Sequence, residues 1–160
     1  MSIYRNSEGY ADPTAGRALG KIAFEERRAR RDADNSFRPL VYICSPFAGD
    51  TEANTDAARG YCAFAVERGS IPLAPHLLYP QFMNDAAPKE RGLALRFAMI
   101  LMDKCDEVWI FGSQLSTGMR AEYDRALKKG YRIRYFTADC MELTREGASQ
   151  LYGKEPSNDR

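Results

Sequence analysis

The sequence lacks several features that would assign a protein to a class at once. It has one histidine and four cysteines in 160 residues, and the cysteines follow neither the spacing of zinc ligands nor that of a CxxC redox pair. We therefore expect reduced thiols, no metal site and no cofactor. No apolar run approaches the roughly 20 residues that span a bilayer, and no leader pattern opens the chain, so we expect a cytoplasmic protein without a membrane partner.

A strong charge of one sign is also missing. The chain has 23 Lys and Arg residues against 22 Asp and Glu residues, which gives a formal net charge of +1. A nucleic acid polymer is therefore not an expected partner, and any recognition of phosphate has to be local. Residues 25–31 mix both signs at helical spacing, which favours a solvated helix face over a nucleic-acid patch.

The apolar content of 44% is enough for one domain of ordinary size. From Pro39 onward, short apolar runs alternate with amphipathic segments, which is the pattern of βαβ units. The predicted fold class is therefore α/β, with a doubly wound, flavodoxin- or Rossmann-like parallel sheet of four to five strands, flanking helices and an N-terminal helical extension. The predicted parts are the extension at 1–38, the α/β domain at 39–152 and a disordered tail at 153–160.

The apolar runs also predict the individual elements. Continuous runs indicate strands buried on both faces, whereas Pro72 gives the second strand an edge position. One reversal of the strand order would bring the loops after the first and third strands together at the ligand-binding edge of the sheet. The predicted strands are 40–44, 71–74, 107–111 and 131–136. The predicted helices are 13–31 after an Asp12 cap, 51–68, one from Pro88 with an apolar face of Leu93, Phe97, Ile100 and Leu101, 116–129 ended by Gly130, and a short one after 139; residues 75–87 form a long loop.

The loop after the third strand carries one candidate site. Ser116 is a good helix cap, Gly118 lets a ligand approach the backbone, and the free N–H groups of a helix start attract anions. The expected ligand there is a phosphate or a carboxylate, although an ordinary cap explains Ser116 alone about as well. Glu122 lies on the flank of a buried stripe that contains Met119. It is either a half-buried nucleophile or base, or a surface carboxylate paired with Arg125.

The loop after the first strand is the other candidate site, and it runs from Ser45 and Pro46 to Gly49 and Asp50. Its small residues suit a close ligand, but it forms neither a Walker loop nor the dinucleotide fingerprint. Asp50 is a candidate cap of the next helix, and one turn on Asn54 either reaches the crevice or faces water. His76 fits a structural or surface role as well as a ligand contact, because a single histidine lacks the partners for nucleophilic catalysis or metal binding.

Together these residues resemble the nucleoside 2-deoxyribosyltransferase-like superfamily, which includes the 2'-deoxynucleoside 5'-phosphate N-hydrolases. The similarity covers about residues 39–136, and its motifs match Val41 to Pro46 and the spacing of Ser116, Gly118, Glu122, Ala126 and Gly130. The resemblance implies that Glu122 attacks the anomeric carbon, that Tyr42 lies beside it and that Ser116 contacts the 5' end of the substrate. It also implies a homodimer or larger homo-oligomer whose sites borrow residues from a neighbouring copy.

One position departs from the family. The family's second catalytic aspartate corresponds to Ala98, and Asp103 lies about 140° further around the same helix, so Asp103 cannot simply replace it. Either another acid such as Glu90 substitutes or catalysis is lost. The serine at 116 favours a nucleotide over a nucleoside, because a hydroxyl donates to phosphate whereas a carboxylate repels it.

The sequence thus predicts an N-glycosidase or deoxyribosyltransferase that acts on a nucleotide 5'-monophosphate through a glutamate nucleophile, Glu122. The first alternative is a catalytically impaired nucleotide-binding sensor or regulatory domain, which Ala98 favours. The second is a structural partner domain that docks through its N-terminal helix. The expected ligand is a small nucleotide or nucleoside. The predicted substrate-binding residues are Tyr42, Ser45, Pro46, Gly49, Asp50, Asn54, His76, Ser116, Gly118 and Met119.

Overall fold

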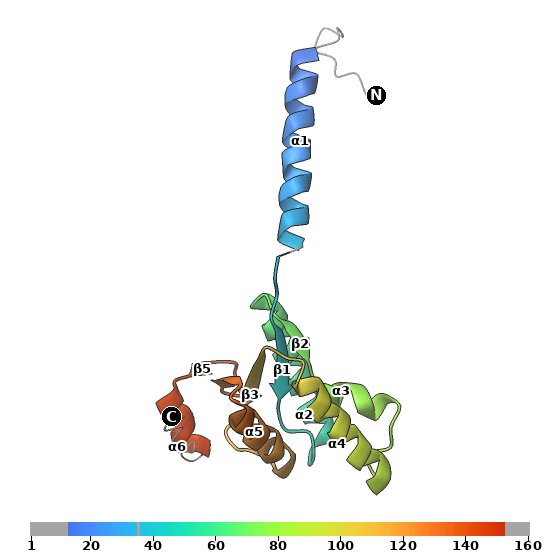
Figure 1. Cartoon of the computed structure of the whole chain (residues 1–160), viewed down its shortest axis with the longest axis vertical. Helices are drawn as coiled ribbons and strands as arrows, with labels where there is room; N and C mark the ends of the chain where they lie inside the picture. Colours follow the sequence, from blue (N-terminus) through green and yellow to red (C-terminus); the bar gives the residue numbers. More distant parts are fainter. Residues whose placement is uncertain (1–12, 35, 153–160) are drawn as a thin grey trace. The chain divides into compact units, whose positions relative to one another are not determined.

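The structure is a computed structural model that describes residues 13–34 and 36–152. The described residues divide into two compact units, with the boundary between Phe37 and Arg38. The helices are α1 (Pro13–Asp34), α2 (Thr51–Glu67), α3 (Pro75–Leu78), the 3-10 turn η1 (Tyr79–Gln81), α4 (Pro88–Met102), α5 (Thr117–Lys129) and α6 (Arg145–Tyr152) (Figure 1). The strands are β1 (Leu40–Cys44), β2 (Ile71–Leu73), β3 (Glu107–Phe111), β4 (Arg132–Phe136) and β5 (Glu142–Leu143).

The strands form one sheet in the order β2-β1-β3-β4-β5. The first four are parallel to one another, and β5 pairs with β4 in the antiparallel direction. The predicted α/β class and the four parallel strands are therefore confirmed, and so is the edge position of the strand that contains Pro72. The prediction of a wholly parallel sheet was wrong for β5, since a two-residue strand leaves no recognisable apolar run in the sequence.

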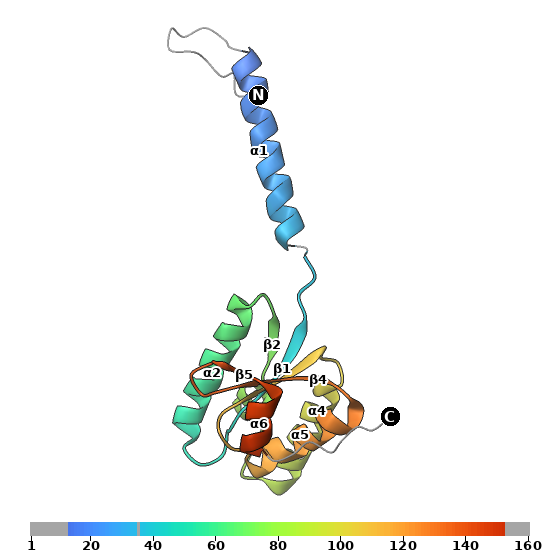
Figure 2. The same ribbon diagram turned by 90° about the vertical axis from the view of Figure 1, so that its left-hand side faces the viewer.

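Alternate residues of the central strands face two separate cores. On one face, Val41 and Ile43 pack with Trp109 beneath α2. On the other face, Tyr42 and Cys44 pack with residues of α4, α5 and α6. Figure 2 shows α2 on one side of the sheet and α4 and α5 on the other. Both faces are therefore covered, which explains why β3 is apolar almost throughout and buried at every position.

Several predicted boundaries needed correction. Residues 75–87 are not one long loop, because Pro75 opens the short helix α3, which continues into η1. Helix α1 ends at Asp34 instead of residue 31. The apolar face predicted for the helix from Pro88 is not buried: Leu93, Phe97 and Ile100 are 41%, 38% and 50% exposed, and the buried residues of α4 are Ala98 and Met102. The Asp12 cap and the tail at 153–160 lie outside the described residues.

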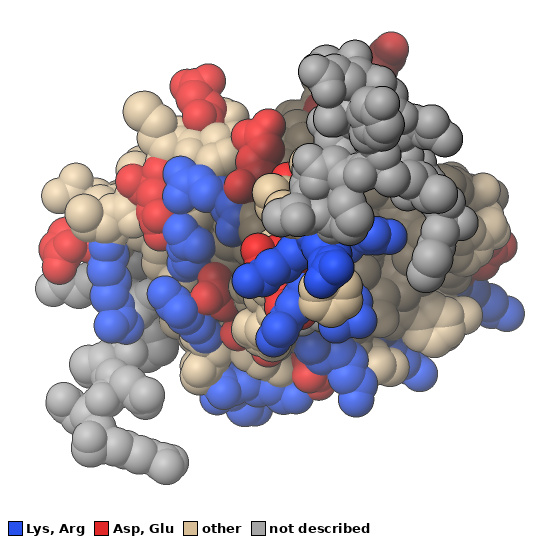
Figure 3. All heavy atoms as spheres, turned by 90° about the horizontal axis from the view of Figure 1, so that it is seen from above, with Lys and Arg blue, Asp and Glu red and all other residues tan. Residues whose placement is uncertain are grey.

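Helix α1 is rich in charged residues. Its charged residues form i,i+4 ion pairs, Lys21 with Glu25 at 4.0 Å and Arg28 with Asp32 at 3.8 Å. The mixed charges thus behave as a solvated helix face. Figure 3 shows Lys and Arg side chains next to Asp and Glu side chains on the visible face of the molecule. Among residues 13–34 and 36–152, none of the helices combines the length and the apolar composition that crossing a bilayer requires.

Candidate functional site

The loops after β1 and β3 meet at the carboxyl end of the sheet. The strand order reverses between β1 and β3, and Cys44 pairs with Ile110 at the ends of these strands. Beyond them, a Cβ built on Gly112 would lie 3.9 Å from Cδ of Pro46, so the two loops are in contact. This is the switch point at which open α/β sheets bind ligands, as the sequence predicted.

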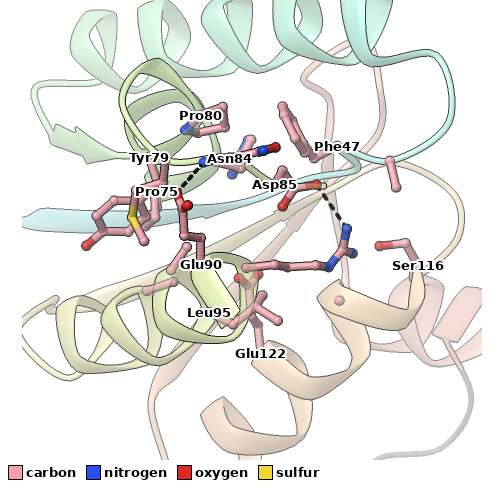
Figure 4. Close-up of a pocket in the computed structure, with 17 residues that line it drawn as sticks. Phe47, Pro75, Tyr79, Pro80, Asn84, Asp85, Glu90, Leu95, Ser116 and Glu122 are labelled. Carbon is pink, nitrogen blue, oxygen red and sulfur yellow. Dashed lines mark hydrogen bonds and ion pairs between the residues drawn. The ribbon is translucent and has the colours of Figure 1, made fainter. Parts of the chain in front are cut away.

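A pocket opens at this edge, with an empty volume of about 720 Å³ that includes its mouth. Figure 4 shows Ser116 and Glu122 coming from one wall and Tyr79 and Pro80 from another. The lining residues are Phe47 and Ala48 after β1, Pro75, His76, Tyr79, Pro80, Met83, Asn84 and Asp85 between β2 and α4, Glu90, Arg91, Ala94, Leu95 and Ala98 of α4, and Ser116, Gly118 and Glu122 at α5.

Glu122 forms a hydrogen bond with Tyr42, a residue of the central strand β1. The Tyr42 hydroxyl donates a hydrogen bond of 2.6 Å to Oε1 of Glu122, across 80 positions of the sequence. Burial raises the pKa of Glu122, while hydrogen bonds from Tyr42 and Cys44 act in the opposite direction. The carboxylate is therefore held in place in a poorly solvated position, which is the environment of a nucleophile or a base.

The alternative prediction for Glu122, a surface ion pair with Arg125, was wrong. Arg125, the residue expected to pair with it, instead donates from Nε to Oδ1 of Asp103 at 3.1 Å. Lys129 and Tyr131 bind the same Asp103 carboxylate, and hydrogen bonds from Arg125 and Lys129 lower the pKa of Asp103. Asp103 thus links α4 to α5 and is not among the lining residues of the pocket.

Ser116 caps α5 as predicted. Its backbone is extended, and its Oγ accepts a hydrogen bond of 3.3 Å from the N–H of Met119. Gly118 lines the pocket, and a Cβ built on it would meet nothing within 4 Å, so the protein leaves space there. Met119 is only 2% exposed and belongs to the core, and it is not part of the pocket lining.

His76 lies in the pocket wall. Its Nε2 is 3.0 Å from Oγ of Ser45, which is itself buried, and its ring is 6.1 Å from that of Phe47. Burial lowers the pKa of His76 to about 4, so the ring is neutral near pH 7. A neutral imidazole can donate or accept one hydrogen bond at the nitrogen that Ser45 leaves free.

The other predicted residues of the β1 loop shape the loop instead of lining the pocket. Asp50 caps α2 by accepting from the N–H of Ala53 at 3.1 Å. The Asn54 amide donates to the carbonyl groups of Phe47 and Ala48, at 3.2 and 3.0 Å. Gly49 has a φ of 97°, a conformation that favours glycine, so the turn itself explains this residue. These contacts hold Phe47 and Ala48 against the pocket.

Sequence reasoning missed most of the wall between β2 and α4. Asp85 and Arg91 form an ion pair at 2.9 Å, and Glu90 accepts a hydrogen bond of 2.7 Å from the N–H of Asn84. A prediction could have started from Pro88, since residues just before and after a helix start lie close together in space. Instead, the expectation of a loop at 75–87 gave these polar residues no fixed position.

Ala98 lies in the pocket wall and is 5% exposed. It occupies the position that corresponds to the second acid in the resemblance described above. The acidic residues that do line the pocket are Asp85, Glu90 and Glu122. Within residues 13–34 and 36–152, no group of three His, Cys, Asp or Glu side chains is placed to hold a metal ion.

Comparison with known families assigns most of the folded part of the chain. Residues 39–136 match the model of a family described as a domain of unknown function (DUF7768). The chain belongs to this family. No curated protein sequence matches this chain.

A solved structure shares the fold. It is the 2-deoxyribosyltransferase from the psychrotolerant bacterium Bacillus psychrosaccharolyticus, described as a biocatalyst for the synthesis of antiviral and antitumoral nucleosides. The two structures align with a TM-score of 0.53 and 14% sequence identity, over 72% of this chain and 85% of the transferase chain. This likeness shows a shared fold, while the family DUF7768 itself carries no assigned activity.

The bond between Tyr42 and Glu122 leads to a prediction on pH dependence. The Tyr42→Phe variant loses a donor that favours the charged carboxylate, so the pKa of Glu122 should rise above its value in the native protein. A nucleophilic carboxylate works only when ionised, and the acid limb of a profile of kcat/KM against pH should therefore move to higher pH. A carboxyl NMR titration of Glu122 measures the same shift without turnover. An unchanged or lower titration midpoint would contradict this account.

Proposed function

We propose that this protein cleaves the bond between base and sugar in a small nucleotide, as an N-glycosidase or a deoxyribosyltransferase. The observation that carries the proposal is the Glu122 carboxylate, which lines the pocket and accepts a hydrogen bond of 2.6 Å from Tyr42. The fold that it shares with a 2-deoxyribosyltransferase adds support. We include in the proposal the cytoplasmic location expected from the sequence.

The reaction would proceed in two displacements. An oxygen of Glu122 attacks C1' of the sugar, and the C1'–N bond breaks with its electron pair leaving on the base, through a transition state that resembles an oxocarbenium ion. The base takes up a proton, and the sugar remains as an ester of Glu122. Water then attacks C1' and releases the carboxylate, or a second base attacks in its place and yields a new nucleoside or nucleotide.

A 5'-phosphate would bind at the start of α5. Ser116 lies at the helix N-terminus, where unpaired N–H groups and the helix dipole favour an anion. The open space at Gly118 lets a ligand approach this backbone. These features favour a nucleoside monophosphate over a nucleoside as the substrate.

A second candidate function is supported by Ala98. If no acid protonates the leaving base, turnover is lost while the pocket remains, and the protein becomes a nucleotide sensor. Incubation with a panel of deoxynucleoside and ribonucleoside monophosphates, followed by chromatography of the released bases, tests the enzyme. A ligand-dependent rise in melting temperature without any released base would reject the enzyme in favour of the sensor.

The oligomeric state is the next prediction. Helix α4 exposes Leu93, Phe97 and Ile100 on one face to between 38% and 50%, and such a group of exposed apolar residues is typical of an interface. Together with the resemblance, this leads us to expect light scattering to give a mass at least twice that of the 18.0 kDa chain. The Phe97→Glu variant should shift the protein toward the monomer. A native protein that is monomeric at micromolar concentration would refute the prediction.

A further inference from the structure

The pocket contains one positive side chain whose role the proposed function does not use. Arg91 is the only Lys or Arg among the described residues that line the pocket. Its Nη1 lies 2.9 Å from Oδ2 of Asp85, and both side chains remain about half exposed, at 50% and 45%. Asp85 lies on the same side of the pocket as Ser116 in Figure 4, where a dashed line marks its ion pair.

The three carboxylates of the pocket differ in what they bind. Glu90 accepts the N–H of Asn84 and so holds the backbone just before α4. Glu122 accepts the hydroxyl of Tyr42. Asp85 binds Arg91 through one ion pair between two half-exposed groups, and an ion pair of this kind contributes little to stability. Of the three contacts, the one between Asp85 and Arg91 is therefore the easiest for a ligand to replace.

We propose that Arg91 binds the 5'-phosphate of the substrate and that Asp85 neutralises Arg91 only while the pocket is empty. A guanidinium group presents several N–H donors in one plane, so it can bind two phosphate oxygens at once, whereas Asp85 engages it through one oxygen. Through its ion pair with Asp85, which lies on the same side of the pocket as Ser116, Arg91 adds a full positive charge to the partial charge at the start of α5. When phosphate binds, Asp85 turns away, because two anions at one guanidinium repel each other.

This inference deepens the proposed function, on which it rests, and it assigns the anion specificity of the pocket to an ion pair that exchanges partners. It also predicts the direction in which phosphate affinity changes when Asp85 loses its charge, and this direction distinguishes a competing residue from a supporting one. A residue that merely positions Arg91 would weaken phosphate binding when removed. A residue that competes with phosphate for Arg91 strengthens it when its charge is removed.

The experiment uses 2-deoxyribose 5-phosphate and 2-deoxyribose as probes, because neither has a base or a glycosidic bond to cleave. Calorimetric titration of the native protein should show tighter binding of the sugar phosphate. The Arg91→Gln variant should bind the sugar phosphate roughly ten-fold more weakly and the sugar unchanged, as expected for a lost charged hydrogen bond. The Asp85→Asn variant should bind the sugar phosphate at least about three-fold more tightly.

The control variant is Arg96→Gln, which makes the same change on the exposed surface of α4 outside the pocket lining and should leave both affinities unchanged. Preserved preference for the sugar phosphate in Arg91→Gln, or weaker binding of it in Asp85→Asn, overturns the inference. Base release is not measured, so the two hypotheses fail separately. If the protein shows these affinities but releases no base, the phosphate site at Arg91 stands and the proposed enzyme activity fails. If it releases base but does not show these affinities, the enzyme activity stands and the phosphate site at Arg91 fails.

Discussion

Replacing Glu122 with glutamine should lower base release from a nucleotide by several orders of magnitude. Glutamine keeps the shape of the side chain and an oxygen that accepts from Tyr42, but an amide does not attack an anomeric carbon as a carboxylate does. The loss should appear in kcat, because the interaction with C1' exists only in the transition state. Chromatography of the released base under single-turnover conditions measures it.

The same variant should remain folded. Burial raises the pKa of Glu122, which means that its charge is costly in the folded state, so removing the charge should leave the melting temperature unchanged or raise it. The matched control is Glu146→Gln in the exposed first turn of α6, which should keep full activity. Undiminished turnover in Glu122→Gln would refute the covalent mechanism.

The Ser116→Asp variant should lose the preference for a nucleoside monophosphate over its nucleoside. Aspartate is also a good helix cap, so α5 should persist, but its carboxylate faces the proposed phosphate. Two unit charges about 4 Å apart repel by about 4 kcal/mol at an effective dielectric constant of 20, an upper figure that salt and rearrangement reduce. A quarter of it would still be a change of about five-fold in affinity.

Calorimetry with one monophosphate and its nucleoside, in both proteins, provides the measurement. Ser113→Asp is the control, because Ser113 is an exposed residue of the same loop that does not line the pocket. It adds the same charge without placing it at the start of α5. If Ser116→Asp keeps the ratio of the two affinities of the native protein, the phosphate is held elsewhere.

The sheet could be predicted because its strands leave a strong signal. Residues 40–44 and 108–111 are apolar on both faces since helices cover both sides, and continuous apolar runs of five and four residues are not typical of an amphipathic helix. The ends of α5 were also predictable, because Ser116 and Gly130 meet local requirements of the backbone: Ser116 caps the helix, and Gly130 has a φ of 70°.

Helix α4 shows where sequence periodicity misleads. Leu93, Phe97 and Ile100 recur at helical spacing, yet the buried residues of α4 are Ala98 and Met102. Periodicity identifies an apolar face without showing what covers it. Asp85 and Arg91 were missed for a related reason: their position depends on how residues 79–87 fold back onto the start of α4, which no local pattern encodes.

The two outer strands of the sheet bear on how copies of this chain can associate. In β2, the N–H of Ile71 donates inward to Pro39 at 2.8 Å, so the next residue, Pro72, has its nitrogen toward the outer edge, and that nitrogen carries no hydrogen. At the opposite edge, β5 is only two residues long. Neither edge is a good template for strand addition, so association of two copies through the edges of the sheet is disfavoured.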